Sequence, residues 1–336
     1  MKIVIMAGGK GTRFWPLSNE EKPKQFRNIY SSKSMLQETY TRFRAWVPAE
    51  KIFVLTKADY IPIIQEQLPE LMLDQIIVEP AQRDTAACVC LTALYFQERE
   101  DDEPLVFSPS DQYISDAEEL KEVLQASNSL AYQDKAIVTL GLKPTRPETQ
   151  YGYMITSDRL NGSPAYQVDC FVEKPSFERA LELCVMENVF WNSGIFVMKP
   201  STILYYMAKF EEEMLYTIMD YINGDKESYL TLNKISVDYA IVEKADIIYM
   251  IPAYFQWDDV GSWSSLDRTF TNDQTGNIVL GNVHSDGVKN CIIHSDQKAV
   301  VIGVEDLIIV STESGLLICN KSEEGKIKNI IGEHFK

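Results

Sequence analysis

The sequence predicts an α/β fold built on a Rossmann-like, mostly parallel sheet, followed by a small C-terminal all-β domain. Two observations carry this prediction. Short apolar runs alternate with helical patterns through about the first 145 residues. After about residue 270, short strands separated by turn residues replace them. We therefore expect domains at residues 1–268 and 269–336, and the second could form a short β-helix.

The first half of the chain contains five predicted strands and four predicted helices. The strands are Lys2–Met6, Lys51–Thr56, Gln75–Glu79, Pro104–Phe107 and Ala136–Gly141. The helices are Ser34–Trp46, Asp59–Gln67, Asp84–Arg99 and Asp116–Tyr132. An Asp opens three of these helices, and Asp is a good N-cap. The β-α order predicts parallel strands covered on both faces, with ligands at their carboxyl ends.

The second half continues this domain before the texture of the sequence changes. Further strands are predicted at Tyr151–Ile155, Tyr166–Phe171 and Gly194–Met198, with helices at Phe177–Glu187 and Pro200–Asp220. Turns at residues 275–277, 285–287 and 323–325 then divide the β-rich tail. This tail could brace the catalytic domain or form a subunit contact.

The charge balance limits the classes of partner. The net charge is −17, and nucleic-acid binding depends on clustered Lys and Arg, so we expect no nucleic-acid partner. No run approaches the roughly 18 apolar residues of a membrane span, and the short N-terminal apolar stretch leads into glycines and charge rather than a cleavage site. We therefore expect a cytoplasmic protein with no membrane partner.

The segment after the first strand has the composition of a phosphate-binding loop. Glycines without a Cβ let backbone N–H groups approach an anion, and Arg and Lys add positive charge. The segment runs Ala7, Gly8, Gly9, Lys10, Gly11, Thr12, Arg13, with Lys24 farther on. Its spacing matches neither the P-loop nor the dinucleotide fingerprint.

This segment instead resembles the signature of the sugar-nucleotide pyrophosphorylases, GG-x-G-T-R followed by P-K at Pro23 and Lys24. Three further segments, FVEKP at 171–175, WNSGIF at 191–196 and WDDVGSW at 257–263, resemble the mannose-1-phosphate guanylyltransferases within that group. Tyr151-Gly152-Tyr153 fits the same pattern, and the resemblance extends through the tail. It is a resemblance to short members of the family, without the cupin isomerase domain.

The resemblance implies the reaction of GTP with mannose 1-phosphate to give GDP-mannose and pyrophosphate, with Mg²⁺ as cofactor. It also leads us to expect a homo-oligomer, a dimer. Because the second pKa of a phosphate monoester is near about 6, the attacking sugar phosphate needs no general base. The three histidines, at 284, 294 and 334, all lie in the tail, which agrees with this expectation.

The resemblance also implies roles for individual residues. The predicted catalytic residues are Arg13, Lys24, Asp111, Lys174 and Asp259, of which Asp111 and Asp259 hold the metal. The nucleotide site is predicted to contain Ala7, Gly8, Gly9, Gly11, Thr12, Arg13, Lys24, Glu79, Asp84, Thr85 and Ser110, with Glu79 reading guanine. The sugar-phosphate site is predicted to contain Gly152, Glu173, Lys174, Asn192 and Ser193.

Some alternatives stay open at this point. Asp258 competes with Asp259 for the metal, and each aspartate could instead cap a helix or a turn. Asp84 and Gln112 stand where the family usually has asparagine and often has histidine. The sugar could be a heptose, fucose or glucose 1-phosphate. The chain could also be a non-catalytic regulator that binds sugar nucleotides, although that reading predicts the loss of phosphate- or metal-binding residues.

Overall fold

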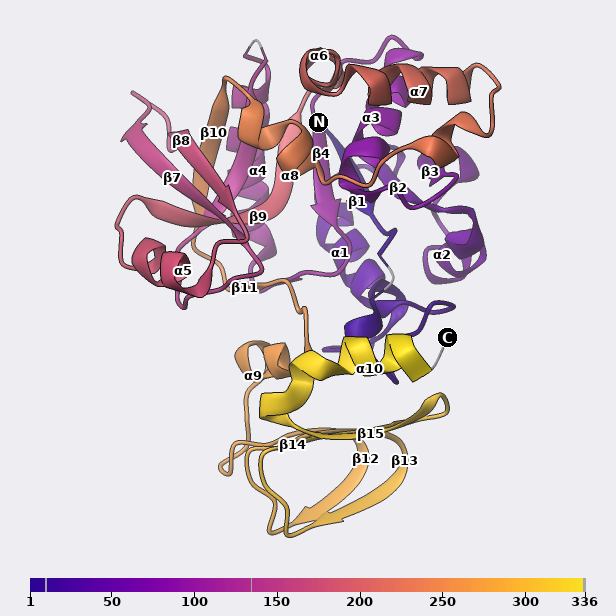
Figure 1. Cartoon of the computed structure of the whole chain (residues 1–336), viewed down its shortest axis with the longest axis vertical. Helices are drawn as coiled ribbons and strands as arrows, with labels where there is room; N and C mark the ends of the chain where they lie inside the picture. Colours follow the sequence, from indigo (N-terminus) through magenta and orange to yellow (C-terminus); the bar gives the residue numbers. More distant parts are fainter. Residues whose placement is uncertain (10, 134, 335–336) are drawn as a thin grey trace. The chain divides into compact units, whose positions relative to one another are not determined.

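The computed structural model describes residues 1–9, 11–133 and 135–334. The chain divides into two compact units, and it passes between them several times (Figure 1). Unit 1 contains residues 1–8, 40–109 and 116–255, and unit 2 contains residues 9–39, 110–115 and 256–336. The domain boundary predicted after residue 268 stays a prediction. The two units are groups of residues that are compact in space, and each is made of several segments of the chain.

Unit 1 is built on a large sheet. Within the described residues its strand order is β3-β2-β1-β4-β9-β6-β10-β8-β7. Its strands are β1 Lys2–Met6, β2 Ile52–Lys57, β3 Ile76–Glu79, β4 Leu105–Pro109, β6 Ile137–Leu142, β7 Gly152–Arg159, β8 Tyr166–Glu173, β9 Val189–Met198 and β10 Ile248–Ala253. The first five predicted strands are confirmed to within two residues at each end, and β9 begins five residues before its predicted start.

The strand directions confirm a mostly parallel sheet. Strands β3, β2, β1 and β4 pair in parallel, as do β6 and β10. Strand β9 is antiparallel to both β4 and β6, and β7 and β8 form an antiparallel pair. By these pairings β8 and β9 run opposite to the other strands. Strands β1, β4 and β6 consist mostly of buried apolar residues, as expected for strands covered on both faces.

Helices cover both faces of this sheet (Figure 1). Helix α3, Asp84–Gln97, is apolar around most of its circumference and packs against α6, Pro200–Phe210, α7, Glu212–Ile222, and α8, Val237–Ala240. Helix α4, Ala117–Ala131, has one apolar face and lies against β6, β9 and β10. Unit 1 also contains α2 Ile61–Gln67 and α5 Phe177–Cys184, and α1 Met35–Arg44 runs from unit 2 into unit 1. No helix in the described residues is long and apolar enough to cross a membrane.

The predicted Asp N-caps are confirmed at one helix and wrong at two. Asp116 caps α4, because its Oδ1 accepts from the N–H groups of Glu118 and Glu119 at 3.0 Å. Asp59 lies in a 3-10 turn that precedes α2. Asp84 is itself the first residue of α3 and has a φ of 68°, where non-glycine residues are uncommon. The helix predicted over 200–220 is confirmed, and it is divided into two helices at Glu211.

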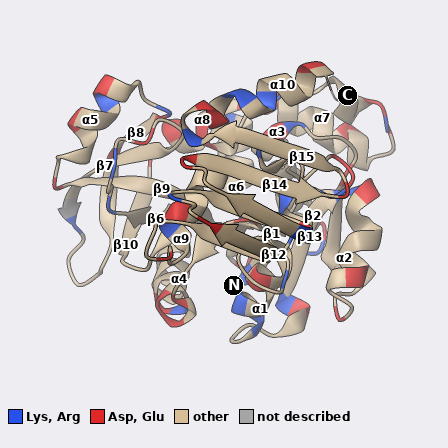
Figure 2. Cartoon of the chain, turned by 90° about the horizontal axis from the view of Figure 1, so that it is seen from below, with Lys and Arg blue, Asp and Glu red and all other residues tan. Residues whose placement is uncertain are grey.

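Unit 2 contains the β-rich tail and segments from the first 115 residues. The tail strands are β12 Ile278–Asp286, β13 Ile292–Ile302, β14 Leu307–Thr312 and β15 Gly315–Asn320. The first three run parallel, and their register aligns Ile278, Ile292 and Ile308, all buried, in one column. Such stacking of equivalent residues is typical of a β-solenoid, which supports the β-helix expectation. Charged side chains are sparse on β14 and β15 (Figure 2).

The core of unit 2 joins the tail to the N-terminal loop. Phe14, Leu17 and Met35 are buried in one cluster with Trp263 and the tail isoleucines. Helix α9, Leu266–Thr269, and a helix that the sequence did not predict, α10 Ile327–His334, complete the unit. Besides its strands the tail thus contains α10, whose buried Ile327 belongs to the same apolar cluster.

Candidate functional site

Lys24 is the centre of a polar cluster in unit 2. Its side chain is buried, and its Nζ donates to the backbone oxygens of Asp111 at 3.0 Å and Asp259 at 2.7 Å. The same Nζ forms an ion pair with Asp111 Oδ2 at 3.0 Å. One ammonium group thus joins two loops that are nearly 150 residues apart in the sequence.

A short β pairing also holds these two loops together. Strand β5, Tyr113–Ile114, runs antiparallel to β11, Trp257–Asp258, with Tyr113 opposite Asp258. Asp111 lies two residues before β5, and Asp259 directly follows β11. The structure therefore brings together the two aspartates that the sequence predicts as metal ligands.

Arg13 lies on the other side of Asp259. A Cβ built on Gly261 would lie 2.6 Å from Asp259 Oδ2 and 3.1 Å from Arg13 Nη1, so both side chains converge on that glycine. Gly11 has a φ of 59°, and a Cβ there would lie 2.6 Å from the backbone nitrogen of Lys24. We call Arg13, Lys24, Asp111 and Asp259 the loop cluster.

Asp258 has a different role from its neighbour. Its buried carboxylate accepts from Arg268 Nε at 2.5 Å and Nη2 at 3.0 Å, and from the N–H of Val260 at 2.8 Å. These bonds use the carboxylate to hold the loop in shape. Of the two adjacent aspartates, Asp259 is therefore the better candidate for a metal ligand.

Glu79 ends strand β3 in unit 1 and lies against Gly8 of the same unit. A Cβ on Gly8 would lie only 2.8 Å from Glu79 Oε1, so the carboxylate touches this stretch of backbone. The side chain of Gln82 donates to the carbonyl of Gly8. Burial, with a further contribution from the negative charge of Asp84, raises the pKa of Glu79 to about 7.

Asp84 and Thr85 lie at the start of α3, near Glu79. Asp84 Oδ1 accepts from the N–H of Thr85 at 2.7 Å. Thr85 Oγ1 accepts from the N–H of Val237 at 2.7 Å, and the N–H of Ala86 donates to Ile235 O at 3.2 Å. The start of α3 is therefore fastened to residues 235–237.

Glu173 and Gly152 face each other in the β7–β8 pair. A Cβ on Gly152 would lie 2.5 Å from Glu173 Oε2, so this glycine makes room for the carboxylate. The mostly buried Glu173 forms an ion pair with Lys174, whose side chain is 49% exposed. Partial burial acts to lower the pKa of Lys174, but the hydrogen bond and charge of Glu173 outweigh it, so the pKa is raised.

Asn192 lies on β9 and is hydrogen bonded on both sides of its amide. Its Oδ1 accepts from Thr139 Oγ1 at 2.8 Å and from the N–H of Gly194 at 3.2 Å. Its Nδ2 donates to Asp238 Oδ1 at 3.1 Å. Ser193 is buried, and its Oγ accepts from the N–H of Ile195 at 3.1 Å. This bond from Ser193 Oγ supports the local backbone of the strand.

The remaining predicted residues have simpler positions. Ala7 is buried and its N–H donates to Leu55 O at 2.8 Å, which continues the pairing of β1. The carbonyl of Gly9 accepts from Gln25 Nε2 at 2.9 Å, and the carbonyl of Ser110 accepts from Thr39 Oγ1 at 3.2 Å. The side chain of Thr12 lies outside the described part of the structure.

Asp238 is the main residue that sequence reasoning missed. It lies on the four-residue helix α8, whose N-cap is Ser236, and no spacing pattern marks it as a site residue. Its importance comes from tertiary contacts alone. A four-residue helix gives no amphipathic signal, so only the fold could reveal this side chain.

The chemistry of the loop cluster fits a hard divalent cation. Among the described residues, no group of three or more His, Cys, Asp and Glu side chains is arranged to hold a metal. Mg²⁺ characteristically takes one or two carboxylates and completes its shell with water and substrate phosphates. Asp111 and Asp259 supply that ligand set, and Arg13 and Lys24 add positive charge for phosphates.

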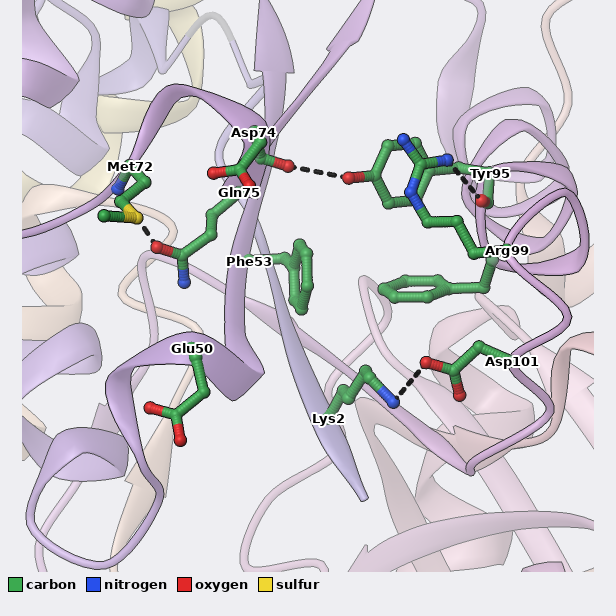
Figure 3. A pocket seen from close by; sticks show the side chains of 10 residues that line it. Lys2, Glu50, Phe53, Met72, Asp74, Gln75, Tyr95, Arg99 and Asp101 are labelled. Atoms are coloured by element: carbon green, nitrogen blue, oxygen red, sulfur yellow. Dashed lines mark hydrogen bonds and ion pairs between the residues drawn. The ribbon is translucent and has the colours of Figure 1, made fainter.

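A separate hollow of about 230 Å³ lies in unit 1 at the amino ends of β1 and β2 (Figure 3). Lys2, Phe53, Tyr95, Arg99 and Asp101 contribute to its walls. Its polar groups bond to one another: Lys2 pairs with Asp101, Tyr95 donates to Asp74 O, and Arg99 donates to Tyr95 O. It lies at the opposite end of these strands from Gly8 and Glu79, so it is not part of the candidate site.

Comparison with known proteins identifies the family. Residues 2–276 match the nucleotidyl transferase family, and residues 282–333 match a β-helix domain described as MannoseP isomerase/GMP-like. A mannose-1-phosphate guanylyltransferase of Klebsiella pneumoniae is 34% identical, over 98% of this chain and 72% of its own length. The alginate biosynthesis protein AlgA of Pseudomonas putida is 33% identical over 98% of this chain and 70% of its own length.

A solved structure agrees over the full chain. It is a Thermus thermophilus protein described as a mannose-1-phosphate geranyltransferase, 31% identical, with a TM-score of 0.91 over 99% of this chain and 98% of that one. These matches confirm the resemblance seen in the loop and strand-end motifs. The chain belongs to the mannose-1-phosphate guanylyltransferase family of nucleotidyltransferases.

Proposed function

We propose that this chain catalyses the reaction of GTP with mannose 1-phosphate to give GDP-mannose and pyrophosphate. The observation that carries the proposal is the loop cluster, in which Lys24 joins the Asp111 and Asp259 loops beside Arg13. A non-catalytic sugar-nucleotide-binding protein would have no need of this arrangement. The similarity to a mannose-1-phosphate guanylyltransferase over 98% of this chain supports the choice of nucleotide and sugar.

The reaction is an in-line displacement at phosphorus. An oxygen of the sugar phosphate forms a bond to the α-phosphorus of GTP, and the bond from that phosphorus to the bridging oxygen breaks. Pyrophosphate leaves with the electron pair of the broken bond. Since the nucleophile is already ionised near neutral pH, the chain has to supply position and charge rather than a base.

The loop cluster provides the charge. Arg13 lies beside Asp259 and can donate hydrogen bonds to phosphate oxygens of GTP. The backbone around Gly8, Gly9 and Gly11 can approach the phosphates closely, with Ala7, Thr12 and Ser110 as neighbours. Asp111 and Asp259 would hold Mg²⁺, which when bound neutralises phosphate charge. Lys24 fixes the backbone of both aspartates, so its first contribution is to keep their carboxylates in place.

The residues of unit 1 recognise the two ends of the substrates. An ionised Glu79 can accept from N1–H and the 2-amino group of guanine, a pair of donors that adenine lacks. Asp84 and Thr85 set its surroundings. Glu173 can accept from hexose hydroxyls, with Gly152, Asn192 and Ser193 shaping the pocket. Lys174, half exposed, can turn to the phosphate of the sugar.

The test is pyrophosphate release in a grid of nucleotides and sugars with Mg²⁺. GTP, UTP, ATP and dTTP are each combined with mannose, glucose, galactose and fucose 1-phosphates, and a heptose 1-phosphate is added. We expect release with GTP and mannose 1-phosphate. Another active pair would keep the chemistry and change the specificity, whereas no release with any pair would favour the regulatory function.

We also propose a cytoplasmic homodimer. Leu316 and Ile318 are exposed on β15, which forms the edge of the small sheet, and edge strands of this kind are open to pairing. Sedimentation velocity at micromolar concentration measures the oligomeric state. A monomer at all concentrations would contradict the dimer.

A further inference from the structure

The hydrogen bonds around Asn192 leave this residue little capacity to bind a sugar. An amide oxygen has two lone pairs, and Asn192 Oδ1 accepts from the N–H of Gly194 and from the Thr139 hydroxyl, whose single proton is shared with Ile195 O at 3.0 Å. One of its two Nδ2 hydrogens goes to Asp238. Asn192 is also only 7% exposed. Its contacts are those of a residue that holds a neighbour in place.

That neighbour is Asp238, whose carboxylate can accept more hydrogen bonds than Asn192 supplies. Asn192 donates to Asp238 Oδ1, and the Ser236 side chain and the backbone at residue 238 also stabilise the carboxylate, which leaves capacity for a further donor. Lys174 forms its ion pair with Glu173 and acts on Asp238 through its charge. A partly buried carboxylate without an ion pair is costly, and such groups are concentrated at functional sites.

The surroundings of Asp238 are charged on one side only. Burial, followed by the charge of Glu173, raises the pKa of Asp238 to about 7, while Lys174 and polar groups of residues 236 and 238 act against this rise. Both charged neighbours lie at the β8 end, whereas Asn192 and Thr139 on β9 and β6 are neutral. Two carboxyl groups that share one environment can accept from two sugar hydroxyls, or donate from the protonated member.

The backbone fixes Asp238 on both sides. Val237 and Ile235 are bonded to Thr85 and Ala86 at the start of α3. Ser236 Oγ accepts from the N–H of Tyr239 at 3.4 Å and caps α8. A recognition group needs such support from its neighbours, because a small displacement would remove its hydrogen bonds.

We propose that Asp238 reads a hydroxyl of the bound hexose beside Glu173, and that Asn192 is the positioning residue that holds the Asp238 carboxylate. This inference rests on the proposed function and adds a specificity-determining residue to it. It also assigns to Asn192 a supporting role instead of direct contact with the sugar.

The experiment compares mannose 1-phosphate with its 2-, 3-, 4- and 6-deoxy analogues in the wild type and in Asp238→Asn. We expect the variant to raise KM for mannose 1-phosphate by about 10-fold or more and to leave KM for GTP within about 2-fold, as for loss of a hydrogen bond to a charged group. One deoxy analogue should have a higher KM than mannose 1-phosphate in the wild type but not in the variant; we call this increase in KM the penalty of that analogue. Unchanged penalties for all four analogues would overturn the assignment.

Three further variants separate recognition from structure. Thr139→Val removes the donor that orients Asn192 and should raise KM for the sugar, and Thr139→Ser should restore it. Asp246→Asn, which breaks only a surface ion pair with Lys209 in the same unit, should change neither KM. If Asp238→Asn does not fold, Asp238→Glu replaces it, because glutamate keeps the charge and moves it by one methylene. The increase in KM for the same deoxy analogue must then differ from that of the wild type.

The activity of the wild type distinguishes a failure of the proposed function from a failure of the role proposed for Asp238. If it is active with a different hexose 1-phosphate, the analogue series is run on that sugar, and the role of Asp238 stands or falls independently of mannose. If it is active with mannose 1-phosphate and Asp238→Asn leaves every penalty unchanged, this inference alone fails. A wild type that neither turns over nor binds any hexose 1-phosphate by calorimetry overturns both.

Discussion

The loop cluster of unit 2 and the carboxylates of unit 1 differ in the segments that supply them and in their charge balance. Arg13, Lys24, Asp111 and Asp259 come from three distant segments, and a buried lysine bonded to two backbone carbonyls unites two of them. Glu79 and Glu173 instead end strands of one sheet, and Asp238 is bonded to Asn192 on a strand of the same sheet. The loop cluster balances its own charge. The unit 1 group includes two carboxyls with raised pKa values, and such groups are concentrated at functional sites.

The largest expected effect is the loss of a metal carboxylate from the loop cluster. Asp111→Asn should lower kcat by about 10³-fold, because it removes charge that would hold Mg²⁺. The melting temperature should stay within a few degrees, since the side chain is about one-third exposed. Steady-state kinetics over a range of Mg²⁺ concentrations measures the change. Turnover like that of the wild type would remove Asp111 from the metal site.

Adjacent aspartates offer a matched pair. Asp259→Asn should abolish most activity and leave the fold intact, whereas Asp258→Asn should chiefly lower the melting temperature, because Arg268 loses a buried bidentate partner. The stability cost should be about 1–3 kcal/mol. Thermal unfolding and kcat are measured for both variants. If Asp258→Asn is the inactive and stable one, the metal assignment moves to Asp258.

Substitution of Lys24 tests whether the loop cluster depends on the hydrogen bonds from its ammonium group to the two aspartate loops. Lys24→Met keeps the buried stem but loses both bonds to the aspartate loops, so the two carboxylates should separate. We expect kcat to fall by about 10²-fold and the Mg²⁺ concentration for half-maximal rate to rise. A lysine that only contacts phosphates would raise KM for GTP without changing the Mg²⁺ requirement. Lys22→Met, in the same loop, is the control.

The same contrast explains what could be predicted from the sequence. The strands of unit 1 follow from short apolar runs, and the places of Glu79 and Asp111 at or just after the ends of strands follow from the same runs. The role of Lys24 as a clamp was not predictable, because its bonds run to backbone atoms from distant segments. No local sequence pattern marked Asp238. The prediction of Asp84 as the N-cap of α3 was wrong, because its backbone is in the left-handed region.

Glu79 tests recognition of the base without touching the loop cluster. Glu79→Gln should reduce the preference for GTP over ATP, as the ratio of kcat/KM values, by about 10- to 100-fold, because the amide cannot accept from two donors as a carboxylate does. The Mg²⁺ requirement should not change. A nucleotide preference equal to that of the wild type would place the guanine reader elsewhere.

The smallest expected effect concerns Asp84, which contributes to the raised pKa of Glu79. Glu79 accepts hydrogen bonds from guanine only when ionised, so the preference for GTP over ATP should be low below about pH 7 and rise above it. Taking the ratio of the two nucleotides cancels the ionisation of their phosphates. Asp84→Asn removes a negative charge near Glu79 and should move the midpoint of this profile toward lower pH, by less than one pH unit because burial is the larger cause. A midpoint that does not move would mean that burial alone sets the titration of Glu79, and one that moves upward would contradict the electrostatic coupling of these two side chains.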